Sequence, residues 1–131
     1  MKSLIADDVL VIRRLIQRAL STYGECEESI NGKETVAKFI NAHKKNESYD
    51  LICLDILMPQ KDGLQVLKDI RQYESQNNIP ETKQVKILMT TILHETNVVN
   101  QAIENGCDGY MVKPIQLDKL LAQIRKFGLI E

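Results

Sequence analysis

Short apolar runs alternate along the chain with longer segments whose apolar residues recur at helical spacing. The clearest run is Leu51–Pro59, in which apolar residues are closed by a proline. Such a run is typical of a strand that is buried on both faces of a parallel sheet. The same criteria predict strands at Lys2–Ala6, Val85–Met89 and Gly109–Val112. Glu25–Ser29 is mostly acidic, so any strand there is expected at an edge of the sheet.

Helical spacing follows each of these runs. The first helix is predicted from Val9, Ile12, Ile16 and Ala19, with Asp8 as its N-cap. Asn31 opens a second helix, and Glu34 three residues later completes a capping box. Three more helices are predicted near residues 63–70, 98–103 and 117–124. Ser75–Gln84 is polar and contains Pro80, so it is predicted to be an extended surface loop.

Strand therefore alternates with helix five times. This alternation predicts an α/β fold in which a five-stranded parallel sheet is doubly wound, with helices on both faces. The length of 131 residues suits one well-packed domain and is short for two. We expect a single domain over residues 1–131, with no output domain in this chain.

Composition narrows the possible partners. The formal net charge of −1 gives no reason to expect direct binding to nucleic acid or to an anionic membrane. The chain has no apolar run long enough to cross a bilayer. The three cysteines show no paired spacing, which indicates free thiols and a cytoplasmic location.

Polar residues stand just beyond each of the strong strands. Asp7 and Asp8 follow the first, Asp55 ends the third, Thr90 and Thr91 follow the fourth, and Lys113 follows the fifth. Each feature alone is usual in a helix cap, a β-strand end or a surface turn. In a parallel sheet, however, these strand ends share one edge, where ligands bind at the point of reversed strand order. We therefore expect the side chains to lie together.

Three crowded carboxylates repel one another unless a cation neutralises them. Their oxygen ligands suit a hard divalent ion such as Mg²⁺ (or Mn²⁺). Lys113 would add an ammonium beside the metal, and a threonine hydroxyl would add a hydrogen-bond donor. This setting favours phosphoryl transfer, with Asp55 as the nucleophile and the cations neutralising charge on the transferring oxygens.

The chain resembles the response-regulator receiver domains of two-component signalling, particularly the stand-alone chemotaxis regulators. The resemblance covers essentially the whole chain and rests on a specific set of motifs: Asp7-Asp8, Asp55 to Pro59 with Gly63, the threonine after the fourth strand, and Gly109-Tyr110 leading to Lys113-Pro114. It implies a flavodoxin-like sheet with strand order 2-1-3-4-5. It also implies that Asp55 accepts a phosphoryl group from a histidine kinase or a histidine phosphotransfer protein.

The resemblance further implies the roles of individual residues. Asp8, Asp55 and the backbone carbonyl of Leu57 would ligate Mg²⁺, with Asp7 acting through water. Lys113 would pair with the phosphoryl group, and the Lys113–Pro114 peptide would be cis.

The switch residues follow from the same resemblance. The interval to Lys113 selects Thr91 over Thr90 as the switch hydroxyl, and Tyr110 falls at the switch aromatic. A half-buried tyrosine on an edge strand is an equally good interpretation of Tyr110. The fourth helix, fifth strand and fifth helix would form the surface that binds a downstream target or serves a phosphorelay.

Three residues depart from the family pattern. Ile92 follows the switch threonine, where receiver domains usually have a small residue, and should crowd the site. Leu57 and Leu93 occupy variable positions at which polar residues in relatives orient the attacking water. Without that help, worth roughly 10²–10⁴-fold in rate, the phosphoryl group should be long-lived.

Other function classes remain open. A flavodoxin-like nucleotide or flavin binder would share the fold, but Asp7 and Asp8 would repel its phosphate. A phosphatase of the haloacid dehalogenase type needs a second acid where this chain has Leu57. A phosphorylation-independent docking module of the same fold is the remaining alternative, and Ile92 is the residue that favours it.

Overall fold

The computed structural model describes residues 1–131 as five strands and five α-helices in strict alternation. The strands are β1 (Ser3–Ala6), β2 (Cys26–Ser29), β3 (Leu51–Asp55), β4 (Lys86–Thr91) and β5 (Gly109–Val112). The α-helices are α1 (Leu10–Leu20), α2 (Gly32–Lys44), α3 (Gly63–Gln76), α4 (Thr96–Glu104) and α5 (Leu117–Lys126). Short 3₁₀ turns lie at Ser21–Tyr23 and Glu81–Lys83.

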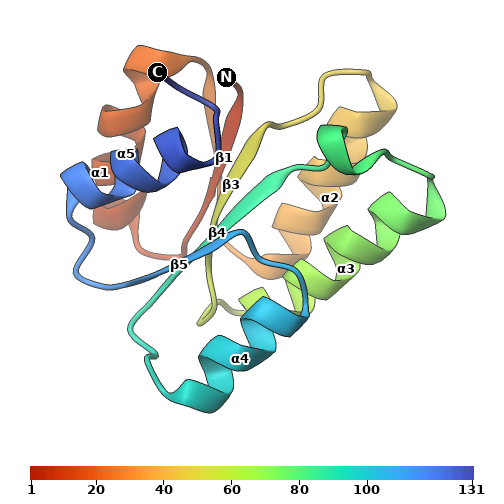
Figure 1. Ribbon diagram of the computed structural model, residues 1–131. Helices are drawn as coiled ribbons and strands as arrows, with labels where there is room; N and C mark the ends of the chain where they lie inside the picture. The colour runs from red at the N-terminus through yellow and green to blue at the C-terminus, as the bar shows by residue number, and fades with distance from the viewer.

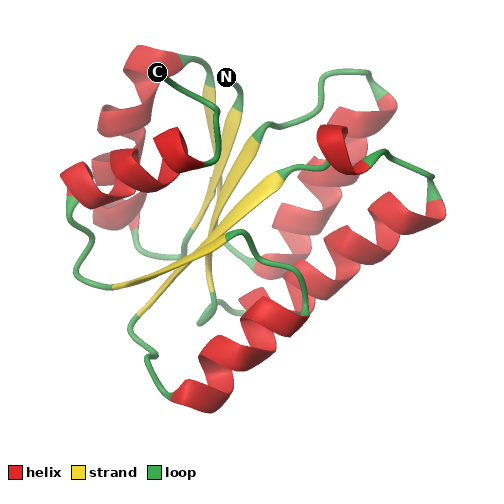
Figure 2. Cartoon of the chain, viewed as in Figure 1, coloured by secondary structure: helices red, strands yellow, loops and turns green.

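All five strands pair in parallel, in the order β2-β1-β3-β4-β5. This confirms the predicted doubly wound sheet. The acidic strand β2 lies at one edge, as its composition indicated, and β5 lies at the other. Helices α1 and α5 cover one face, whereas α2, α3 and α4 lie on the opposite side (Figures 1 and 2).

The core consists of two clusters separated by the sheet. The larger cluster joins β3 and β4 side chains such as Ile52, Leu54 and Ile87 to α2 and α3. The smaller cluster joins Ile5 and Leu88 to α1 and α5. Every residue of β3 is buried, as expected for a central strand with both faces covered.

Two sequence-based predictions of local structure were wrong. Asp8 does not cap α1: the helix begins after Val9 without a side-chain cap, and the Asp7 carboxylate accepts the Val9 N–H at 2.9 Å instead. The predicted loop at Ser75–Gln84 is partly helical, because α3 continues to Gln76 and a 3₁₀ turn follows Pro80. By contrast, Asn31 caps α2 by accepting the Glu34 N–H at 2.7 Å.

Candidate functional site

The sheet register brings four strand ends together at one edge. Ala6 pairs with Leu54, so Asp7 follows β1 beside the end of β3. Asp55 is the last residue of β3 and pairs with Thr90 of β4. One step further, Thr91 pairs with Val112, the residue before Lys113. The alternation of strand and helix therefore positions the polar residues that the sequence singled out.

The three acids form one cluster. Carboxylate oxygens of Asp7, Asp8 and Asp55 all lie within 4.8 Å of one another. Asp7 and Asp55 are 1% and 4% exposed, whereas Asp8 is exposed to solvent. Ionised carboxylates are costly to bury without compensation, so this cluster needs positive charge nearby.

Lys113 supplies part of that charge. Its Nζ donates to Oδ2 of Asp7 at 2.7 Å and to Oδ2 of Asp55 at 3.2 Å, and its side chain is 10% exposed. Burial alone would lower the pKa of Lys113. The hydrogen bond to Asp7 and the charges of Asp55 and Asp7 outweigh that effect and raise the pKa above its ordinary value. The lysine is therefore held as an ammonium.

Asp55 is less well compensated. Burial raises its pKa, the charge of Lys113 opposes that rise, and the charge of Asp7 adds to it, so that the net pKa lies above the ordinary value. The backbone N–H of Leu57 also donates to Asp55 Oδ1 at 3.3 Å. One ammonium thus faces three carboxylates. A donor set of carboxylate oxygens with excess negative charge fits Mg²⁺, which requires few protein ligands and keeps several waters.

Thr91, Leu93 and Tyr110 are linked beside this cluster. The hydroxyl oxygen of Thr91, which is fully buried, accepts the backbone N–H of Leu93 at 3.2 Å. The hydroxyl of Tyr110, on β5, donates to the backbone carbonyl of Leu93 at 2.5 Å. Tyr110 is half-buried and packs against the larger core cluster.

The three apolar residues around the site differ in exposure. Leu57 and Ile92 are 47% and 61% exposed, so both side chains face solvent next to the strand ends. Leu93 is half-buried and packs against the larger core cluster. The Lys113–Pro114 peptide is cis.

Arg13, on α1, lies next to the site but contacts none of its three carboxylates. Arg13 donates from Nη1 to the backbone carbonyl of Asp7 at 2.9 Å and forms an ion pair with Glu28 at 3.2 Å. Its side chain is only 11% exposed, although Arg13 lies outside the apolar spacing Val9, Ile12, Ile16 and Ala19 that predicted this helix. Helical periodicity does not show that a neighbouring strand end reaches over that face.

Comparison with known proteins agrees with this geometry. A sequence model of the response regulator receiver domain matches residues 3–125. The chain belongs to the response regulator receiver family.

Relatives of the receiver domain differ in length. The chemotaxis protein CheY of Bacillus subtilis is 34% identical over 125 residues, covering 94% of this chain and 93% of that protein. CheY of Listeria monocytogenes is 30% identical, with 96% and 97% covered. The transcriptional regulatory protein ResD of Bacillus subtilis is 34% identical, but the match covers only 46% of its length.

Solved structures share the fold. CheY4 of Vibrio cholerae superposes with a TM-score of 0.77 at 28% identity, covering 95% of this chain and 96% of that one. The complex of CheX, CheY, BeF₃ and Mg²⁺ from Borrelia burgdorferi contains a chain with a TM-score of 0.83 at 22% identity, covering 100% and 90%. In the receiver domain described here, every helix is too short or too polar to span a membrane.

Proposed function

We propose that this receiver domain accepts a phosphoryl group on Asp55 from a histidine kinase or a histidine phosphotransfer protein, in a Mg²⁺-dependent reaction. The observation that carries the proposal is the charge imbalance at the strand ends. Asp7, Asp8 and Asp55 converge within 4.8 Å, and one ammonium contacts two of them. Such a site keeps an excess of negative charge until a divalent cation binds.

Different residues would hold the metal ion, attack the phosphoryl group and neutralise its charge. Asp8, Asp55 and the Leu57 carbonyl would hold the ion, with Asp7 acting through water. When bound, Mg²⁺ neutralises negative charge on the transferring oxygens. A carboxylate oxygen of Asp55 donates its electron pair to phosphorus, and the bond from phosphorus to the donor's imidazole nitrogen breaks. The Lys113 ammonium, already 3.2 Å from Asp55, then pairs with the new phosphoryl oxygens.

The phosphoryl group would act on a switch formed by Thr91 and Tyr110. The Thr91 hydroxyl now accepts the Leu93 N–H, and the Leu93 carbonyl accepts the Tyr110 hydroxyl. If Thr91 turns to donate to the phosphoryl group, its bond to Leu93 is lost and the Tyr110 contact changes with it. A local electrostatic event would thereby reach β5 and α4.

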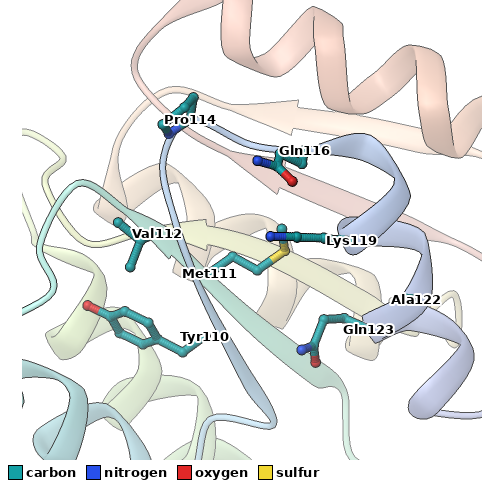
Figure 3. A pocket seen from close by; sticks show the side chains of 8 residues that line it. All are labelled: Tyr110, Met111, Val112, Pro114, Gln116, Lys119, Ala122 and Gln123. Atoms are coloured by element: carbon teal, nitrogen blue, oxygen red, sulfur yellow. The ribbon is translucent and has the colours of Figure 1, made fainter.

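A groove beside β5 supports a role for this surface in binding a downstream protein. The groove has a volume of about 430 Å³ and lies between the edge strand β5 and helix α5. In Figure 3, Lys119 and Gln123 extend from α5 toward the strand, and Tyr110 belongs to the same lining. The Tyr110 ring points away from α5 in the same view, so a change at Tyr110 would reach the groove through the backbone of β5.

The apolar residues Leu57 and Leu93 would make the phosphoryl group long-lived. Neither side chain can orient a water molecule or accept its proton. The exposed Ile92 side chain would further hinder access of water. Since positioned acid–base help is worth roughly 10²–10⁴-fold, hydrolysis should be slower by a factor in that range than in a receiver domain with polar residues there.

The test is incubation with acetyl phosphate and Mg²⁺, followed by intact-mass measurement. We expect one phosphoryl adduct on the wild-type chain and none after Asp55→Asn. Asp118→Asn is the matched control, because Asp118 is an exposed carboxylate in the first turn of α5 and does not belong to the cluster of Asp7, Asp8 and Asp55. A chelator should abolish the adduct. An adduct that persists in Asp55→Asn, or no uptake by a folded wild-type chain from acetyl phosphate or a histidine phosphodonor, would refute the proposal.

A further inference from the structure

Helix α4 packs against the rest of the molecule with few side chains, chiefly Val98 and Ala102. Of its nine residues only Ala102 is buried, and Ile103 is 59% exposed. In Figure 1, α4 lies at the edge of the molecule, next to α3. With so little apolar surface buried along its length, the position of α4 depends on what holds each end.

The front end of α4 is joined to the switch residues. Leu93, three residues before the helix, is hydrogen-bonded to Thr91 and to Tyr110. Glu95 occupies the N-cap position without a side-chain hydrogen bond to the helix. The first turn of α4 is therefore fixed by contacts that would change when Thr91 changes partner.

The rear end is held by backbone hydrogen bonds and by one guanidinium. Arg71, on α3, donates from Nε to the Gly106 carbonyl at 3.0 Å and from Nη2 to Asp108 Oδ2 at 2.8 Å. Gly106 has a φ of +95°, which favours glycine and forms the turn that ends α4. Both residues belong to the link between α4 and β5, so Arg71 fixes this link to α3.

The same guanidinium is fixed to the sheet. Its Nη1 donates to the Val85 carbonyl at 2.8 Å and to Glu74 Oε1 at 2.7 Å. Glu74 is 1% exposed, and its other oxygen accepts the Val85 N–H at 2.9 Å. Asp108 in turn accepts the N–H of Ile87 at 2.8 Å. Bonds to two carboxylates and two backbone carbonyls make Arg71 a rigid connection between α3, the start of β4 and the start of β5.

We propose that Arg71 is the fixed anchor about which α4 moves when the switch is operated. This inference rests on the proposed function, because it assigns to α4 a response to phosphorylation. Rearrangement is confined to residues 92–99, at the front of the helix. The backbone of residues 102–110 keeps its position, so that the Tyr110 side chain changes relative to a fixed strand start. Arg71 is a positioning residue, since it lies at the end of the sheet opposite the acids.

Hydrogen exchange followed by mass spectrometry tests the anchor with the full chain. In the wild type, acetyl phosphate and Mg²⁺ should change exchange in residues 92–99 and leave residues 102–110 unchanged. In Arg71→Gln, the amides of Cys107 and Asp108, which donate to Ala102 and Ile87, should exchange at least about tenfold faster even without donor. The phosphorylation-dependent change should then extend into residues 102–110.

Two further variants separate the anchor from general destabilisation. Lys86→Gln removes another cation near Asp108. The Lys86 Nζ lies 3.9 Å from Asp108 Oδ1, too far for a hydrogen bond, so this variant should behave as wild type. Arg71→Lys should restore part of the protection, because an ammonium can replace some of the four bonds. If Arg71→Gln does not fold, Asp108→Asn provides the same comparison by weakening the charged contact alone.

The outcomes distinguish this inference from the proposed function. Intact mass on the same samples reports whether Asp55 was phosphorylated. If the wild type takes up no phosphoryl group, the proposed function fails and the inference falls with it. If uptake is normal but exchange changes equally along residues 92–110, the anchor is wrong and the phosphoacceptor role stands. Unchanged exchange at Cys107 and Asp108 in folded Arg71→Gln would also overturn the anchor.

Discussion

Replacing Lys113 with methionine should show how much the single ammonium contributes to the acid cluster. Methionine keeps an apolar stem of similar reach and removes the charge. The substitution leaves Asp7 and Asp55, 1% and 4% exposed, without their lysine partner at 2.7 and 3.2 Å. Removing one member of a buried ion pair typically costs about 3–5 kcal/mol, because the remaining charge stays buried and uncompensated.

We expect a loss near the lower end of that range, about 3 kcal/mol in the free energy of unfolding without divalent ions. The loss is limited because burial already raises the pKa of Asp55, so this carboxyl can take up a proton once Lys113 is gone. Mg²⁺ should restore stability, since a ligand that binds only the folded state adds about 2.7 kcal/mol at 100 times its dissociation constant. The gain should be larger in Lys113→Met than in the wild type, because no ammonium competes for the carboxylates.

Urea unfolding at neutral pH, with and without Mg²⁺, measures both quantities. Lys119→Met is the matched control, because Lys119 is exposed on α5 and makes no ion pair. It should change the free energy of unfolding by less than about 0.5 kcal/mol and leave the Mg²⁺ effect as in the wild type. A loss below about 1 kcal/mol in Lys113→Met, or an unchanged Mg²⁺ increment, would refute the argument that the site is short of positive charge.

Three further results are expected. Asp55→Asn should be more stable than the wild type at neutral pH, because burial raises the pKa of Asp55 and disfavours its ionised form. The wild type loses stability as pH rises through that pKa. Urea titrations should therefore show a smaller difference in the free energy of unfolding between the two proteins at acidic pH. Cys53, 1% exposed and with its pKa raised to about 12 by burial, should resist a thiol reagent until urea unfolds the chain. Gly63→Ala should cost about 1–3 kcal/mol by urea unfolding and slow phosphorylation, because a Cβ would lie 2.2 Å from the Asp55 carbonyl oxygen.

The order of elements could be predicted because every strand except the acidic β2 carries its own apolar signal. A central parallel strand such as β3 is buried on both faces, so its apolar run is readable without knowledge of its neighbours. The convergence of Asp7, Asp55 and Lys113 follows from that order alone, since carboxyl ends of parallel strands share an edge. Fold and candidate site were thus predicted together.

The wrong predictions concern contacts between elements. Val9 fits the helical pattern of α1, yet it precedes the helix and is 46% exposed. Glu74 directly precedes the segment Ser75–Gln84, which was predicted to be a surface loop because it is polar and contains Pro80. The structure buries Glu74 completely in α3, where Arg71 three residues earlier and the Val85 N–H satisfy its oxygens. An i,i+3 pair was visible in the sequence, but the strand that buries it was not.

Burial of charge alone does not identify the functional end of the sheet. Asp7 and Glu74 are each 1% exposed, and they lie at opposite ends of the strands. Both carboxylate oxygens of Glu74 have hydrogen-bond partners within the protein, one guanidinium and one backbone N–H. Around Asp7, one ammonium contacts two of three converging carboxylates, so the cluster keeps an excess of negative charge. The excess of negative charge around Asp7, and not burial, distinguishes this cluster from the one around Glu74 and makes it the candidate functional site.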